Sequence, residues 1–118
     1  MQPNRGGTAA AVAAEVRRDK RIHVAVPVKL FLDAGSTDGQ LCCTFEISLI
    51  GARLMAASGV SEVGQIVWLQ RNNKRGKFKV IWVGERGTAQ ENQLGVETLE
   101  PANMIWENEL KMRIMKSA

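Results

Sequence analysis

Two short segments carry side chains that could form an anion-binding clamp. The first contains Arg17 and Arg21, an R-x-x-x-R pattern within a basic stretch. The second is an acidic-x-S-x-x-G pattern formed by Glu46, Ser48 and Gly51. A planar guanidinium can hold a phosphate with two parallel hydrogen bonds and can also stack on a flat ring. A hydroxyl and a glycine nearby would add a short donor and a close approach of the backbone.

Each of these residues also has a purely structural explanation. Glu46 could form an ion pair with an arginine of the first segment, Ser48 could bond a local backbone group, and Gly51 could simply turn the chain. Arg18 and Lys20 are best explained as screening charge, although Arg18 could replace a neighbour as a ligand contact. The residue types alone leave both explanations open.

Side chains for catalysis or metal binding are scarce in the sequence. His23 is the single histidine, and Ser48 has no base beside it in the sequence. Cys42 and Cys43 are adjacent, so they have neither metal-ligand spacing nor an easy disulfide geometry. We therefore expect no enzymatic activity, no metal and no cofactor, with both cysteines reduced.

The net charge of +4 is concentrated in two clusters. Residues 1–21 hold five basic and two acidic side chains, which accounts for +3 of the total. A second basic cluster follows, and it contains Arg71, Lys74, Arg75, Lys77 and Lys79. Such a cluster is more often a solvated loop than a nucleic-acid surface, so we do not expect a nucleic-acid partner.

A series of short strands must position these groups. Alternating apolar residues and turn formers predict strands over 23–32, 41–50, 52–56, 65–70, 77–84 and 93–99. Residues 71–76 should form a hairpin loop, and Gly51 marks either a bend or the start of a new strand. With no helix between the strands, the pattern predicts an antiparallel barrel or sandwich.

Within the first predicted strand, Val24, Val26, Val28, Leu30 and Leu32 should share the buried face and Phe31 should lie on the other. Pro27 cannot donate to a ladder, so we expect this strand at an edge or with a bulge. Along the strand over 77–84, Phe78 and Trp82 are expected to be core residues rather than stacking platforms.

The two ends of the chain differ from its centre. Residues 1–16 lack large apolar side chains and are expected to form a flexible N-terminal tail. Residues from about 102 to 115 should form an amphipathic helix, because Trp106, Leu110 and Ile114 recur every four residues and Glu107 precedes Lys111 by four. This helix is expected to cover an open end of the barrel, or alternatively to bind a partner.

The length of 118 residues fits a single domain, which we assign to residues 17–115. No run approaches the ~20 apolar residues of a membrane span, and the Ala-rich stretch near the N-terminus is too short for a signal peptide. We therefore expect a cytoplasmic protein without a membrane span.

The R-x-x-x-R pattern is followed along the chain by the acidic-x-S-x-x-G pattern. These two motifs in this order make the sequence resemble the PilZ domain family, the bacterial receptors for cyclic di-GMP. The resemblance implies a six-stranded antiparallel β-barrel with a C-terminal helix. It also implies that Arg17, Arg21, Glu46, Ser48 and Gly51 contact cyclic di-GMP, with Arg18 as a possible additional contact. The family pattern has Asp or Asn where this sequence has Glu46, which is longer by one methylene.

The resemblance leaves two functions to be separated. In the first, the arginine arm folds over cyclic di-GMP and turns second-messenger binding into a conformational signal for a protein partner that the sequence does not name. In the second, which the Glu46 departure motivates, the domain is a PilZ-like adaptor that binds no nucleotide and acts through protein contacts.

Overall fold

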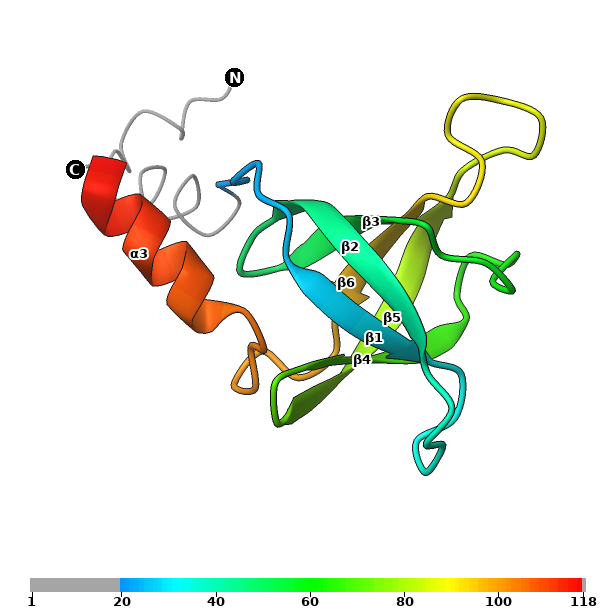
Figure 1. Cartoon of the computed structure of the whole chain (residues 1–118), viewed down its shortest axis with the longest axis horizontal. Helices are drawn as coiled ribbons and strands as arrows, with labels where there is room; N and C mark the ends of the chain where they lie inside the picture. Colours follow the sequence, from blue (N-terminus) through cyan, green and yellow to red (C-terminus); the bar gives the residue numbers. More distant parts are fainter. Residues whose placement is uncertain (1–19, 118) are drawn as a thin grey trace, which may run out of the picture.

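The structure is a computed structural model that describes the backbone of residues 20–117 and the side chains of residues 20–112. The expected flexible tail, residues 1–16, lies outside the described residues, and so do Arg17 and Arg18. Figure 1 shows the strands arranged as a barrel, with the C-terminal helix beside it. Among residues 20–117, no helix has both the length and the apolar composition of a membrane-spanning segment.

Six antiparallel strands between residues 20 and 117 close into a barrel in the order β1-β2-β3-β6-β5-β4. The strands are β1 (Pro27–Phe31), β2 (Gln40–Ile47), β3 (Gly51–Met55), β4 (Ile66–Arg71), β5 (Lys74–Val83) and β6 (Leu94–Thr98). The helix α3 (Glu107–Ser117) follows the last strand. The predicted six-stranded antiparallel barrel with one C-terminal helix is thus confirmed, and Gly51 begins a new strand rather than a bend.

The interior of the barrel is apolar and continues beneath the start of α3. Its largest fully buried side chains are Trp106, Phe78, Leu30, Ile47, Leu54, Leu69, Leu94, Leu110, Val26, Val28, Val67 and Val80. Thr44 is a buried polar residue, and its hydroxyl accepts the Val26 N–H at 2.8 Å and donates to the Val24 carbonyl at 2.7 Å. A satisfied hydroxyl of this kind avoids the cost of burying an unpaired polar group.

Strand β1 corrects two expectations. It is not an edge strand, because it pairs with both β2 and β4. Pro27 is tolerated there as the first residue of the strand, and the pairing with β4 begins only at Lys29. The expected buried face is also wrong at the end of the strand, because Leu32 is 44% exposed whereas Phe31 is buried. The guanidinium of Arg75 covers the Phe31 ring at 3.7 Å, which explains that burial.

The second basic cluster is partly built into the fold. The expected loop over 71–76 is only a two-residue turn, because β5 already begins at Lys74. Arg71 forms an ion pair with Glu109 of α3 at 2.9 Å. Arg75 donates to the Gln70 side chain and to the carbonyls of Ala34 and Ser36. These two arginines are therefore committed to internal contacts.

Helix α3 begins at Glu107, later than the expected start near residue 102. The preceding residues form turns that are tied to β5, since the Asn103 side chain donates to the Arg75 carbonyl at 3.0 Å. The predicted pair of Glu107 and Lys111 is present, with charged atoms 3.2 Å apart. The side chain of Ile114 lies outside the described side chains.

We expect Gly51→Ala to lower the free energy of unfolding by roughly 1–3 kcal/mol or more, as overpacking does. A Cβ at this position would lie 1.9 Å from the Val96 carbonyl oxygen, so β3 and β6 would have to separate. Gly35→Ala is the matched control, because a Cβ there meets nothing within 4 Å. Urea unfolding of both variants measures the difference, and equal stability of the two would contradict the close approach.

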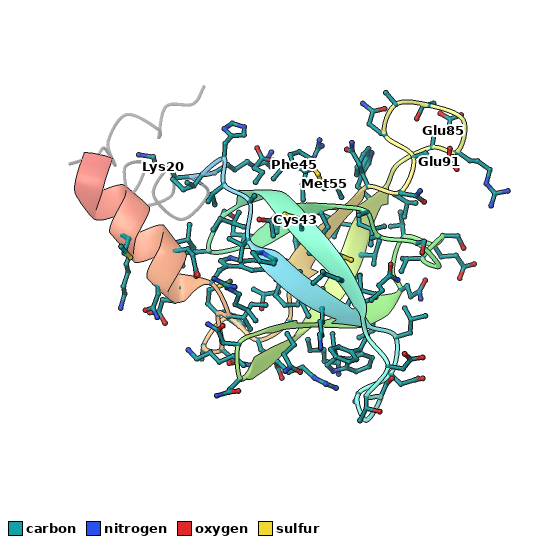
Figure 2. All side chains as sticks on the ribbon, viewed as in Figure 1. Lys20, Cys43, Phe45, Met55, Glu85 and Glu91 are labelled. Atoms are coloured by element: carbon teal, nitrogen blue, oxygen red, sulfur yellow. The ribbon has the colours of Figure 1, made fainter. Side chains whose placement is uncertain are left out.

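The two cysteines are expected to differ in reactivity. Burial and the neighbouring Cys43 raise the pKa of the Cys42 thiol from 9.0 to about 11, so only about one in a thousand Cys42 side chains is a thiolate at pH 8. Cys43 is half-buried on the outer face, where it pairs across the strands with Met55 (Figure 2).

Iodoacetamide at pH 8 should therefore alkylate Cys43 and spare Cys42 in the folded protein, and it should alkylate both in denaturant. Fragment-ion mass spectrometry locates the label. Equal labelling of the two residues in the folded protein would show that the Cys42 thiol is not buried.

Candidate functional site

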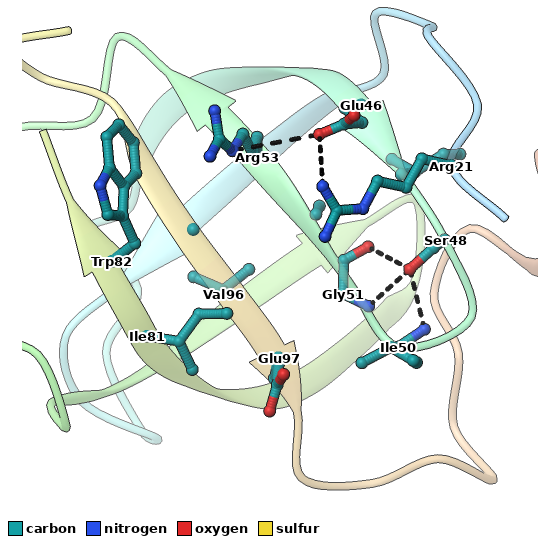
Figure 3. Close-up of a pocket in the computed structure, with 13 residues that line it drawn as sticks. Arg21, Glu46, Ser48, Ile50, Gly51, Arg53, Ile81, Trp82, Val96 and Glu97 are labelled. Atoms are coloured by element: carbon teal, nitrogen blue, oxygen red, sulfur yellow. Dashed lines mark hydrogen bonds and ion pairs between the residues drawn. The ribbon is translucent and has the colours of Figure 1, made fainter. Parts of the chain in front are cut away.

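A row of outward-facing residues crosses four neighbouring strands, and Figure 3 shows Glu46, Arg53 and Trp82 of this row. Glu46 of β2 pairs with Arg53 of β3, Arg53 pairs with Gly95 of β6, and Gly95 pairs with Trp82 of β5. Directly paired residues on one face of a sheet lie within contact distance of each other. The row therefore brings a carboxylate, a guanidinium and an indole together from distant parts of the sequence.

Two β-bulges produce this row. In β2 the register shifts between Thr44 and Glu46, and in β5 it shifts between Val80 and Trp82. Each bulge adds one residue, which reverses the alternation of inward and outward side chains beyond it. Trp82 consequently faces outward and is only partly buried, so the expectation that it is a core residue is wrong.

Gly95 leaves room for a contact between its two neighbours in the row. Because it has no side chain, the Arg53 guanidinium reaches across it and lies over the Trp82 ring, 4.6 Å from the ring centre. A cation above an indole is attracted by the electron-rich face of the ring. This contact shows that the exposed face of Trp82 can hold a flat cationic group.

The residues before β1 place a second arginine beside the row. Ile22 exchanges two backbone hydrogen bonds with Ile47, at 2.8 and 2.9 Å, which fixes this segment alongside β2. Arg21 is thereby directed toward Glu46. Its side chain remains 66% exposed, so one end of the guanidinium is accessible to solvent.

Three cationic or potentially cationic side chains surround the Glu46 carboxylate. Arg21 and His23 each approach it to 3.8 Å, and Arg53 approaches it to 4.0 Å. The Glu46 side chain is only 15% exposed. At these separations the groups attract each other as charges without close hydrogen bonds, so a ligand could exchange partners with them at low cost.

The Ser48 hydroxyl is engaged within its own turn. Its Oγ accepts the backbone N–H groups of Ile50 at 3.0 Å and Gly51 at 3.1 Å, while the Ser48 N–H donates to the Gly51 carbonyl at 2.8 Å. Ser48 is buried. The motif serine therefore stabilises the turn between β2 and β3.

Gly51 is required by the contact with β6. Its backbone approaches the Val96 carbonyl so closely that no side chain fits, and its φ lies outside the left-handed region. Close approach, rather than an unusual bend, explains this glycine.

These residues line a hollow of about 180 Å³ on the outer face of the barrel. Its lining comprises Arg21, Glu46, Ile47, Ser48, Ile50, Gly51, Ala52, Arg53, Ile81, Trp82, Gly95, Val96 and Glu97. Four of the predicted site residues, Arg21, Glu46, Ser48 and Gly51, thus come together, whereas Arg17 and Arg18 lie outside the described residues. Within the described part of the chain, no cluster of three or more acidic, histidine or cysteine side chains could hold a metal.

Sequence reasoning missed two members of the site, Arg53 and Trp82. Arg53 follows the motif glycine by two residues, so the alternation of β3 could have placed it on the outer face. No such signal existed for Trp82, because the bulge at Ile81 interrupts a pattern that otherwise looks regular.

Comparison with solved structures identifies the fold. The chain is similar to the Bacillus subtilis inhibitor of motility MotI/DgrA, with a TM-score of 0.57 and 12% identity over 81% of this chain. It is also similar to the PilZ domain of CeSA from a cellulose-synthesizing bacterium, with a TM-score of 0.56 and 13% identity over 77% of this chain. The chain has the PilZ fold.

The two comparison structures differ in how much of their length this chain covers. The chain spans 99% of the CeSA PilZ domain but only 50% of the MotI/DgrA chain. No model of a known protein family matches the sequence, and no curated protein matches it. The structural similarity confirms the resemblance that the two motifs indicated, at the level of the fold.

We expect Ser48→Ala to lower the free energy of unfolding by about 1–3 kcal/mol without any ligand, because the Ile50 and Gly51 N–H groups would lose their acceptor. Ser61→Ala, at an exposed position, is the control. Urea unfolding provides the measurement. If Ser48→Ala were as stable as Ser61→Ala, the hydroxyl would not be supporting the turn.

Proposed function

We propose that this domain is a receptor for cyclic di-GMP and binds it over the hollow between Arg21 and Trp82. One observation carries the proposal: Arg21 and the motif of Glu46, Ser48 and Gly51 are 25 or more residues apart in the sequence and line the same hollow. The PilZ fold supports it, as does the chemistry of the lining.

The charged side chains suit both parts of the ligand. The exposed guanidinium of Arg21 can bind a phosphate or the O6/N7 edge of a guanine. Glu46 can accept the N1–H and N2 amino protons of the same base type. On the basis of the R-x-x-x-R motif alone, we propose that Arg17 is the second arginine that binds the ligand. Arg18 is a possible further contact.

The Trp82 indole supplies a surface for stacking a base. Its outer face now holds the Arg53 guanidinium, and a guanine could occupy the same face. Arg53 would then be released toward the ligand phosphates, since it already lies between Trp82 and Glu46. The exchange of one flat group for another requires no change in the barrel.

In this proposal the protein is a cytoplasmic effector without catalytic activity. Arg21 already faces the hollow. Ligand binding brings the part of the arm that carries Arg17 over the hollow beside it, and the altered surface is passed on by contact with a protein partner. We do not propose nucleic-acid binding, because Arg71 and Arg75 are committed to internal contacts.

A second function, a PilZ-like adaptor that binds no nucleotide, is favoured by two sets of contacts at the hollow. The Ser48 hydroxyl is already engaged by two backbone N–H groups, and Arg53 already covers Trp82. Glu46 also departs from the Asp or Asn of the family motif. A hollow whose polar groups satisfy one another could serve a domain that acts through protein contacts alone.

Isothermal titration with cyclic di-GMP separates the two functions. The receptor proposal predicts saturable heat, and Arg21→Ala should weaken binding about ten- to hundredfold because a charge-assisted hydrogen bond is lost. Arg86→Ala removes the same charge from an exposed position that is not part of the lining, and it should bind like the wild type. Absence of both heat and a thermal shift at roughly 300 μM ligand, which corresponds to a binding free energy weaker than about −5 kcal/mol, would refute the receptor proposal and favour the adaptor.

A further inference from the structure

Helix α3 is joined to the turn of the candidate site by one buried hydrogen bond. Trp106, the residue before α3, donates its indole Nε1–H to the Ser48 carbonyl at 2.8 Å. Trp106 is fully buried and does not line the hollow. The turn from Ser48 to Gly51 therefore has the hollow on one side and the Trp106 indole on another.

Trp106 has two further contacts, one through its ring and one through its backbone. Its ring packs against Phe78 with ring centres 5.4 Å apart, and the Trp106 carbonyl accepts the Leu110 N–H at 3.1 Å in the first turn of α3. If the site turn moved alone, a buried indole N–H and a buried carbonyl would each lose a partner, which is costly. We therefore expect the site turn and the start of α3 to move together.

A second contact holds α3 to the barrel at a distance from the turn. Glu109 forms an ion pair with Arg71 at the end of β4, with charged atoms 2.9 Å apart. The helix therefore has one polar contact with the site turn and another with the barrel wall. The two can be removed separately, which makes their roles distinguishable.

We infer that Trp106 is a positioning residue for the site turn and couples ligand occupancy to helix α3. The identity of the ligand rests on the proposed function, whereas the coupling between turn and helix does not. Because coupling between two sites is reciprocal, a partner that binds α3 would change the affinity of the hollow by the same factor that the ligand changes the affinity for the partner. Helix α3 is then the element through which the domain reports occupancy.

The first test needs no ligand. Trp106→Phe keeps a ring beside Phe78 but removes the N–H donor, and we expect the amide protons of Ile50 and Gly51 to exchange with solvent at least tenfold faster. Glu109→Gln is the matched control, because it weakens the other contact and should leave these two amides unchanged. Amides of the β4–β5 ladder report global stability in the same spectra.

Unchanged exchange of Ile50 and Gly51 in Trp106→Phe would overturn the coupling. So would an equal acceleration of the β4–β5 ladder amides in Trp106→Phe, because the effect would then be a loss of global stability rather than a change at the site turn. Acceleration confined to Trp106→Phe supports it.

The second test uses the wild-type protein, so it remains decisive if Trp106→Phe fails to fold. Titration with cyclic di-GMP, followed by proton–nitrogen NMR, should shift the Trp106 indole N–H resonance and slow exchange of the Leu110 amide. Binding by calorimetry without either change would refute the coupling and leave the receptor proposal intact. Absence of binding would refute the receptor proposal. The hydrogen-exchange comparison of Trp106→Phe with Glu109→Gln would then decide whether the turn and the helix are coupled.

Discussion

The alternation of inward and outward side chains in a closed barrel is the constraint on which the site depends. Each strand directs alternate side chains into and out of the barrel, so a residue can line the outer face only at an outward position. The bulges in β2 and β5 shift that alternation by one residue, and they bring Glu46 and Trp82 into one row with Arg53. Gly95 completes the row because its missing side chain lets the guanidinium reach the indole.

Some motif residues stabilise the backbone around the hollow, and others place charged side chains at it. Ser48 and Gly51 hold the turn between β2 and β3 and allow its close contact with β6. Arg21 and Glu46 supply charge at the hollow, together with Arg53. The same turn bonds Trp106 on its buried side, so the residues that shape the site also connect it to α3.

The fold was largely predictable from local patterns, and the site only in part. Alternating apolar residues and glycine-rich turns located all six strands, because these signals depend on near neighbours in the sequence. The burial of Phe31 and the outward turn of Trp82 were not predictable, since the first depends on Arg75 from a distant strand and the second on a bulge. Likewise, the bond between Trp106 and Ser48 joins residues 58 positions apart, and no local pattern reports it.

A crystal structure of the protein with cyclic di-GMP would show where the ligand lies. We expect a guanine on the outer face of Trp82, a phosphate or guanine edge bonded to Arg21, and the Arg53 guanidinium displaced from the indole. Ligand density on another face of the barrel, or a bound ligand with Arg53 still covering Trp82, would contradict this expectation.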